Sequence, residues 1–231
     1  MMNTYINKPS LPRDASSVII IKRKNNKLFV LMGRRPAKSK FMPGIYVFPG
    51  GAIDKTDYQI NKLFNLSTKL KKSLLKSRTT KHTIAIMLAA IRETAEECGL
   101  FLAEKKTVKY ENLNINNTWN IFLEKSLIPC IRKLNYFGRA ITPSFLKTRF
   151  HARFFIANFD DFIGKIKTNG ELENIGWIEI KKAKLLPIAD VTEFLINRLI
   201  ELDNNKIILK KNRSYPMFTR RNNKKWVKWD Q

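Results

Sequence analysis

The sequence has 231 residues, of which 44% are apolar, enough for one domain with a substantial buried core. Its 44 Lys and Arg against 19 Asp and Glu give a net charge of +25, which attracts anions such as nucleotides, nucleic acid or lipid headgroups. No apolar run reaches the roughly 18–20 residues that a membrane span needs, the N-terminal segment lacks a secretory pattern, and two cysteines cannot form a disulfide framework. We therefore expect a cytoplasmic protein with no membrane span and an anionic partner.

The first predicted element is a β-hairpin. Residues 17–22 and 27–34 are apolar and rich in β-branched side chains, and Asn25-Asn26 between them is a turn signal. A loop and a short apolar strand at residues 45–48 follow. We expect Pro49-Gly50-Gly51 to end that strand, because proline lacks a backbone donor and glycine tolerates positive φ.

A lysine-rich stretch without any acidic residue covers residues 58–83. Leucines recur in it at helical spacing, which predicts an amphipathic helix; they are Leu63, Leu66, Leu70 and Leu74. Its basic face fits three roles: a lid over an anionic substrate, a contact in a homodimer, or a helix on a membrane surface.

The strongest helical pattern runs from Ile84 to Cys98 and ends at Gly99, a residue favoured just after a helix. Beyond it, strands and helices are mixed. We predict helices at 119–127 and 190–202, the latter with Asp190 and Glu193 spaced as in a capping box, and strands at 153–158 and 176–180.

This order of elements predicts one α/β domain with a mixed sheet over residues 1–204. Residues 205–231 hold nine Lys or Arg and one acid, and are expected to form a basic tail. The tail interleaves Trp226 and Trp229 with lysines, a combination able to stack bases and hold phosphates, although packing on the domain is the simpler expectation.

The 84–98 helix is amphipathic in an unusual way. Its apolar side would bury against the sheet and consists of Ile84, Met87, Leu88, Ile91 and Ala95. The opposite side carries Ala89 and Ala90, which we expect to leave room for a ligand.

Three acids, Glu93, Glu96 and Glu97, fall within about 100° of one another on that opposite side. Like charges on adjacent turns repel, so a compensating cation is expected. A hard divalent ion such as Mg²⁺ binds carboxylate oxygens together with substrate phosphates. A plain solvated acidic face is the alternative, which is less ordinary in a chain this basic.

The surrounding residues resemble a known motif. Arg92–Leu100 resembles the second half of the Nudix box, R-E-U-x-E-E-x-G-U with U aliphatic, and Phe48–Gly51 resembles the loop that opens it. Three departures stand out: Thr94 replaces an aliphatic residue, Asp57 stands where Glu is expected, and 34 residues separate Asp57 from Arg92.

A box split in this way resembles the Nudix hydrolases related to the peroxisomal coenzyme A diphosphatase. That branch shares the run F-M-P-G-x-x-V-F-P-G-G, here Phe41–Gly51, and R-E-T-x-E-E-C-G, here Arg92–Gly99. Similar strings begin at Arg139 and Arg149, so the resemblance covers roughly residues 16–200. It implies a Nudix fold, with a mixed sheet sandwiched between helices and a helical insertion inside the box.

The resemblance also implies roles for individual residues. Glu93 and Glu97 would bind Mg²⁺ or Mn²⁺, joined by Glu96, with Asp57 as a weaker candidate ligand. Arg92 would brace a glutamate or the entry loop.

The general base would be Glu96 or a carboxylate outside the box. Glu171 and Glu173 are the candidates outside the box, and Glu173 is the one assigned. Gly50 and Gly51 would let the backbone approach the metal–phosphate cluster.

Residues before the box bear on the substrate. Arg35, Lys40 and Gly44 approximate the signature of coenzyme A hydrolases, and Arg34 with Arg35 would grip a phosphate. Hydrolysis of coenzyme A or acyl-CoA to 3′,5′-ADP and 4′-phosphopantetheine is therefore the first expectation. The alternatives are hydrolysis of ADP-ribose, NADH or capped RNA, or a Nudix-fold module that binds nucleotide or RNA without cleaving it.

Overall fold

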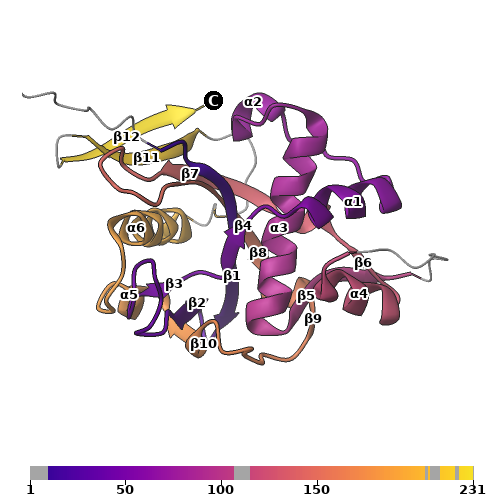
Figure 1. Ribbon diagram of the computed structural model, residues 1–231. Coiled ribbons are helices and arrows are strands. Elements are labelled where there is room, and N and C mark those ends of the chain that lie inside the picture. Colours follow the sequence, from indigo (N-terminus) through magenta and orange to yellow (C-terminus); the bar gives the residue numbers. More distant parts are fainter. Residues whose placement is uncertain (1–9, 107–114, 206–207, 209–213, 222–223, 231) are drawn as a thin grey trace, which may run out of the picture.

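The computed structural model describes residues 10–106, 115–205, 208, 214–221 and 224–230 (Figure 1). Its helices are α1 (Lys55–Phe64), α2 (Lys72–Leu75), α3 (Thr80–Cys98), α4 (Asn117–Glu124), α5 (Ile180–Ala183) and α6 (Asp190–Asn204). Its strands are β1 (Arg13–Lys24), β2 (Lys27–Arg34), β3 (Tyr46–Val47), β4 (Gly50–Ala52), β5 (Leu100–Lys105), β6 (Leu127–Pro129), β7 (Asn135–Ile141), β8 (Phe150–Asn158), β9 (Phe162–Gly164), β10 (Glu173–Glu179), β11 (Tyr215–Arg221) and β12 (Lys224–Asp230).

One mixed sheet organises these elements. Its strand order is β10-β2-β1-β8-β7-β11-β12, with the short strands β3 and β4 paired to β2 and β1. The β1–β8 and β7–β11 pairs are parallel, and the other pairs in this sheet are antiparallel. Strands β6, β5 and β9 form a separate small sheet. The predicted α/β class with a mixed sheet between helices is confirmed.

Strand β1 is buried on both faces, which explains its continuous apolar run. Val18 and Ile20 belong to the core under α3, whereas Ile19 and Ile21 belong to the core under α6. Figure 1 shows α3 on one side of the sheet and α6 on the other, so the fold has three layers.

The predicted hairpin of residues 17–22 and 27–34 is confirmed as β1–β2. Asn25 and Asn26 both have positive φ, 49° and 57°, as a tight turn between twisted strands requires. The strand predicted at 45–48 is reduced to β3. Gly50 and Gly51 do not simply end a strand, because they open β4 and pair with Ser17 and Ser16 of β1.

The 58–83 stretch is not one amphipathic helix. Asn65 ends α1 in the left-handed conformation, with φ 46°, and α2 is a single turn. Helix α1 packs on α3, and Ile60 and Leu75 are fully buried in the core under α3. The insertion therefore thickens the α3 layer.

Helix α3 ends as predicted, with Gly99 at φ 66° and its N–H bonded to Ala95. The expected space beside Ala89 and Ala90 is absent, since both are fully buried. The capping box predicted for α6 is wrong: Ala189 is the N-cap, and Asp190 lies one position inside the helix.

The C-terminal residues contribute two strands to the sheet. Strand β11 pairs in parallel with β7, and β12 pairs with β11 at the sheet edge. Arg139 of β7 and Asp230 of β12 form a buried ion pair, with Nε and Oδ2 2.8 Å apart. Residues 215–221 and 224–230 are thus part of the folded sheet rather than a separate tail. In the part of the chain described, no helix is both long and apolar enough to cross a membrane.

Candidate active site

The last two turns of α3 carry the three predicted acids. Glu97 is buried, while Glu93 and Glu96 are half-buried. Thr94, on the opposite side of the helix, is fully buried and its hydroxyl donates to the Ala90 carbonyl at 2.7 Å. This internal bond explains how a polar residue occupies a position where the Nudix pattern has an aliphatic one.

Gly50 and Gly51 bring the β4 backbone against these acids. The Gly50 N–H donates to Glu97 Oε2 at 2.9 Å. A Cβ at Gly51 would lie 2.4–2.5 Å from the Glu93 carboxylate, and Gly50 has φ 154° with no room for a Cβ beside the Ser16 carbonyl. Position 50 therefore requires glycine, whereas a side chain at position 51 would displace the Glu93 carboxylate.

A third carboxylate joins the cluster from the segment before β10. Ligand oxygens of Glu93, Glu97 and Glu171 all lie within 4.8 Å of one another. Glu171 is exposed and is held by a turn in which its N–H donates to Asn169 Oδ1, and the Asn169 side-chain amide donates to Glu171 Oε1, both at 3.0 Å. The cluster thus joins α3 to a loop 74 residues further along the chain than Glu97.

The pKa values of the two α3 carboxylates in the cluster are raised. Burial raises the pKa of Glu97 to about 8, the Gly50 hydrogen bond opposes this shift, repulsion from Glu93 and Glu171 adds to it, and nearby Arg35 opposes it. Burial also raises the pKa of Glu93 to about 7, although Arg92 opposes this shift. A bound cation would stabilise the ionised forms of both.

Arg92 bonds acceptors on three segments, α1, α3 and β4. Its Nε donates to Asp57 Oδ1 at 2.9 Å, its Nη1 donates to Glu93 and Glu96, and its Nη2 donates to the Ala52 carbonyl at 2.8 Å. Arg92 is buried, and its charge and geometry hold α3 to the β4 segment. Arg92 thus contacts two glutamates of α3 and the β4 backbone, the two partners considered for it from the sequence.

Asp57 does not lie in the acidic cluster. It is fully buried, and it accepts hydrogen bonds from Arg92, from Trp119 Nε1 at 3.1 Å and from the Asp54 N–H at 2.8 Å. The last of these completes the capping box of α1. Since its oxygens already bond three protein donors, Asp57 is placed as a structural partner of Arg92 rather than as a metal ligand.

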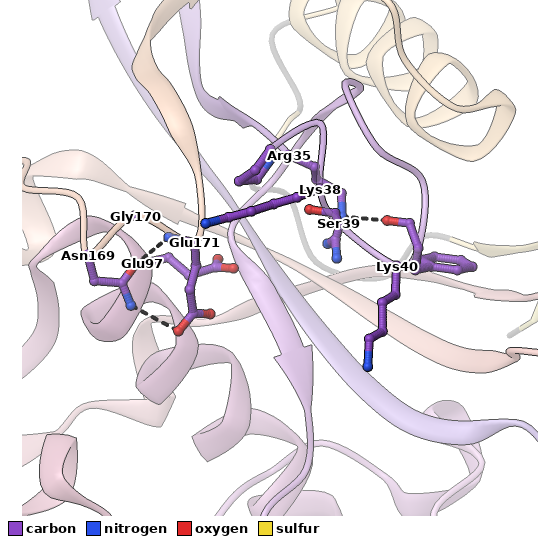
Figure 2. Close-up of a pocket in the computed structure, with 10 residues that line it drawn as sticks. Arg35, Lys38, Ser39, Lys40, Glu97, Asn169, Gly170 and Glu171 are labelled. Atoms are coloured by element: carbon purple, nitrogen blue, oxygen red, sulfur yellow. Dashed lines mark hydrogen bonds between the residues drawn. The ribbon is translucent and has the colours of Figure 1, made fainter.

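A cavity of about 670 Å³ opens on Glu97 and Glu171. Its opposite wall is basic: Figure 2 shows Arg35, Lys38 and Lys40 on the loop after β2, with Lys38 pointing toward the Gly170 side. The cavity is lined by Arg35, Pro36, Lys38, Ser39, Lys40, Phe41, Glu97, Asn169, Gly170 and Glu171. Its lining includes no described residue of 58–83, so the insertion is not a lid over this cavity.

Of the predicted site residues, Arg35, Lys40 and Glu97 line this cavity, whereas Arg34 and Glu173 lie beside it on paired strands. Arg34 braces the base of the loop, with its Nε donating to the Gly44 carbonyl at 3.2 Å. Glu173 is exposed and faces Arg34 across the β10–β2 pair. Arg35 lines the cavity and also braces the loop, since its Nε donates to the Phe41 carbonyl at 2.8 Å.

The donor set of Glu93, Glu97 and Glu171 fits a hard divalent cation. All three offer carboxylate oxygens, which Mg²⁺ and Mn²⁺ prefer. Glu97 and Glu171 form no ion pair with Lys or Arg among the described residues. Glu96 stands apart, with its Oε2 3.0 Å from Arg92 Nη1.

Sequence reasoning did not identify Lys38 or Asn169, since neither belongs to a motif, and it preferred Glu173 to Glu171. The signal for Glu171 was weak but present. Thr168-Asn169-Gly170 is a turn sequence, and a turn directly before a strand can hold one side chain over the neighbouring helix end.

Comparisons with known proteins support the fold described above. No protein-family model matches the chain. The protein "Putative nudix hydrolase 7" of Caenorhabditis elegans is 28% identical over 178 residues, which are 74% of this chain and 52% of that protein. The chain therefore spans about half the length of this curated relative.

A solved structure gives a stronger likeness of fold. The NUDIX hydrolase of Alicyclobacillus acidocaldarius matches with a TM-score of 0.68 at 22% identity, over 87% of this chain and 96% of that one. The mutator MutT protein of Bacillus halodurans matches with a TM-score of 0.49 at 12% identity, over 94% and 97% of the two chains. The likeness to the A. acidocaldarius structure shows that the chain has the fold of the Nudix hydrolases.

Proposed function

We propose that this chain is a Nudix pyrophosphohydrolase that depends on Mg²⁺ or Mn²⁺ and cleaves the diphosphate linkage of a nucleoside diphosphate derivative. The observation that carries the proposal is the Glu93–Glu97–Glu171 cluster at the edge of a cavity with a basic opposite wall. Charges of opposite sign on facing walls suit a substrate whose diphosphate binds both a metal ion and cationic side chains.

In this assignment Glu93, Glu97 and Glu171 hold the metal ion. When bound, such an ion screens the diphosphate charge and lowers the pKa of a coordinated water. Gly50 fixes Glu97 through its N–H, and Arg92 fixes Glu93 and orients Glu96.

Glu96 is the proposed acceptor of the proton of the attacking water, because Glu171 serves as a metal ligand in this assignment. The ion pair with Arg92 orients the Glu96 carboxylate.

Coenzyme A or acyl-CoA is the proposed substrate, giving 3′,5′-ADP and 4′-phosphopantetheine. The support is the basic loop, in which Arg35, Lys38 and Lys40 line the cavity and are able to bind the extra 3′-phosphate of coenzyme A. Arg35 is braced by its bond to Phe41, so its guanidinium is held in a fixed orientation. We also propose a reducing, cytoplasmic setting, which fits the two buried thiols of Cys98 and Cys130.

The test is a substrate panel with Mg²⁺ and with Mn²⁺, comparing the wild-type protein with Glu97→Gln. The panel contains coenzyme A, acetyl-CoA, ADP-ribose, NADH and a capped oligonucleotide. We expect release of 3′,5′-ADP from coenzyme A, abolished by EDTA and lowered about 10³-fold in Glu97→Gln, which corresponds to about 4 kcal/mol of lost transition-state stabilisation. Glu104→Gln, an exposed acid on β5, is the matched control and should keep full activity.

Each other result has a defined meaning. Turnover of ADP-ribose, NADH or capped RNA without turnover of coenzyme A would overturn the substrate alone. Equal activity of Glu97→Gln and wild type would overturn the metal site. Tight nucleotide binding without turnover of any panel member would overturn the enzymatic assignment in favour of a binding module.

A further inference from the structure

The β11–β12 hairpin presents two chemically different faces. Side chains alternate between the faces of a strand, and cross-strand partners share a face. One face carries Arg220, Lys225, Val227 and Trp229, and the other carries Arg221, Lys224, Trp226 and Lys228. We call these the inner and outer faces of the hairpin.

The inner face is packed and neutralised. Val227 packs in the core under α6, and Arg198 of α6 lies over the Trp229 ring at 5.1 Å. Lys225 pairs with Glu193 at 2.7 Å, and Arg220 pairs with Asp190 at 3.2 Å. The cations on this face therefore have carboxylate partners on α6.

The outer face has cations without such partners. Arg221, Lys224 and Lys228 are exposed, and among the described residues none of them takes part in an ion pair. The Arg221 guanidinium lies 4.0 Å from the centre of the half-buried Trp226 ring. Lys224 and Lys228 flank Trp226 two positions away on the same strand, about 7 Å to either side.

From this arrangement we infer that the outer face is a binding surface for single-stranded nucleic acid, in which Lys224 and Lys228 contact phosphates and the Arg221–Trp226 pair stacks on a base. Three unpaired cations around one indole match the two chemical groups that alternate along a single strand, namely anionic phosphates and flat bases. The net charge of +25 adds long-range attraction for a polyanion.

A lipid surface matches this face less well. Insertion into a bilayer interface requires exposed apolar side chains beside the basic ones. The exposed tryptophan of the hairpin is Trp229, at 44%, and it lies on the inner face against α6. The outer face offers only one half-buried indole among its cations, which favours a polyanion with stacking groups.

The hairpin surface is separate from the catalytic cavity. Strand β10, next to Glu171, and strand β12 form opposite edges of the sheet, as Figure 1 shows. They are six strand spacings apart, or roughly 29 Å at about 4.8 Å per spacing. Binding at the hairpin should therefore be independent of the acidic cluster and of hydrolysis.

The test is fluorescence anisotropy of a labelled 15-nucleotide RNA, titrated with the full chain in EDTA at several KCl concentrations. Lys224→Gln/Lys228→Gln should weaken binding at least tenfold and lower the slope of log K against log salt by roughly 1–2. The matched control Arg220→Gln/Lys225→Gln removes the same charge from the inner face and should weaken binding no more than twofold.

A second pair of variants tests stacking. Trp226→Leu should weaken RNA binding by roughly fivefold or more, whereas Trp229→Leu should leave it within twofold of wild type. Circular dichroism confirms that each variant is folded. Glu97→Gln should bind RNA as tightly as wild type even if it loses hydrolysis, which separates this inference from the proposed enzyme.

Three outcomes overturn the inference. Equal losses of RNA affinity in Lys224→Gln/Lys228→Gln and in Arg220→Gln/Lys225→Gln would show attraction by total charge alone. Tighter binding to vesicles containing phosphatidylserine than to RNA, with the same dependence on Lys224 and Lys228, would identify a lipid surface. Loss of RNA binding in Glu97→Gln would place the RNA in the catalytic cavity.

Discussion

The carboxylates around the end of α3 fall into two groups that differ in their counter-charge. Asp57 and Glu96 are paired with Arg92, whereas Glu97 and Glu171 have no cationic partner among the described residues. Glu93 belongs to both groups, since it pairs with Arg92 and also lies within the cluster. The first group stabilises the fold through ion pairs, whereas the second group is available to a bound cation.

Adjacent positions in one motif thus have different physical roles. Arg92 and Glu93 are neighbours in sequence, yet one completes a buried ion pair and the other faces Gly51 at the cluster. The buried Arg92–Asp57 pair fixes the position of α3, because removing either partner leaves a buried charge uncompensated. This ion pair holds the end of α3 in place although Glu93 and Glu97, which it carries, are buried and repel each other.

The largest expected effect on stability comes from the paired group. Asp57→Asn should lower the free energy of unfolding by about 3 kcal/mol, because it leaves buried Arg92 short of a counter-charge. For a chain of this size that corresponds to a fall in Tm of roughly 6–12 °C. Thermal unfolding with and without Mg²⁺ checks this, and the stabilisation by Mg²⁺ should persist in the variant.

The control for this prediction is Glu104→Gln. Glu104 pairs with Arg132, but both side chains are exposed, so the change should cost under about 1 kcal/mol. If Asp57→Asn instead kept full stability and lost the response to Mg²⁺, Asp57 would belong to the metal site and the two groups would merge.

The next effect concerns the unpaired group and pH. The pKa of Glu97 is raised to about 8 and that of Glu93 to about 7, so the folded chain holds protons that the unfolded chain releases near 4.5. Stability of the metal-free protein should therefore be greatest below about pH 4.5 as far as these two groups are concerned, and should fall as pH rises toward 8. Between pH 6 and 8 the two groups together should lower the free energy of unfolding by about 3–4 kcal/mol, with the larger part from Glu97.

Urea unfolding at pH 6, 7 and 8 in EDTA measures this loss. Saturating Mg²⁺ should reverse most of it, because the ion stabilises the ionised carboxylates. Glu97→Gln should flatten the dependence. A wild-type protein whose stability did not change over this range would show that the cluster is already neutralised by the protein, which would remove the distinction between the two groups.

Much of this arrangement could be predicted from sequence, and the reasons are local. The 84–98 helix, its Gly99 end and the β1–β2 hairpin follow from periodicity and turn residues. The contacts of Gly50 and Gly51 with α3 match the expected close approach, because the motif spacing encodes it. These features depend on residues near one another in the chain or within one motif.

The remaining features depend on tertiary contacts. The periodic leucines of 58–83 pack on α3 in two short helices, because Asn65 interrupts them. Strand β11 pairs with β7, a partner more than 70 residues away, and β12 pairs with β11, while the lysines of β12 obscured the alternation of a strand. Asp57 was assigned from its place in the box, although burial beside Arg92 and Trp119 decides its role.

The smallest effect distinguishes two acids two positions apart. Glu171 lies in the cluster and Glu173 faces Arg34, so the comparison predicts that only the first contributes to hydrolysis. Glu171→Gln should lower kcat about tenfold with KM little changed, since an exposed loop ligand is partly replaceable by water. Glu173→Gln, of the same charge change, should stay within twofold of wild type. Steady-state kinetics at fixed Mg²⁺ measures both variants. A larger loss of kcat in Glu173→Gln than in Glu171→Gln would identify Glu173, the residue preferred from the sequence, as the acid outside the box that contributes to hydrolysis. The segment before β10 would then adopt a different register when substrate is bound.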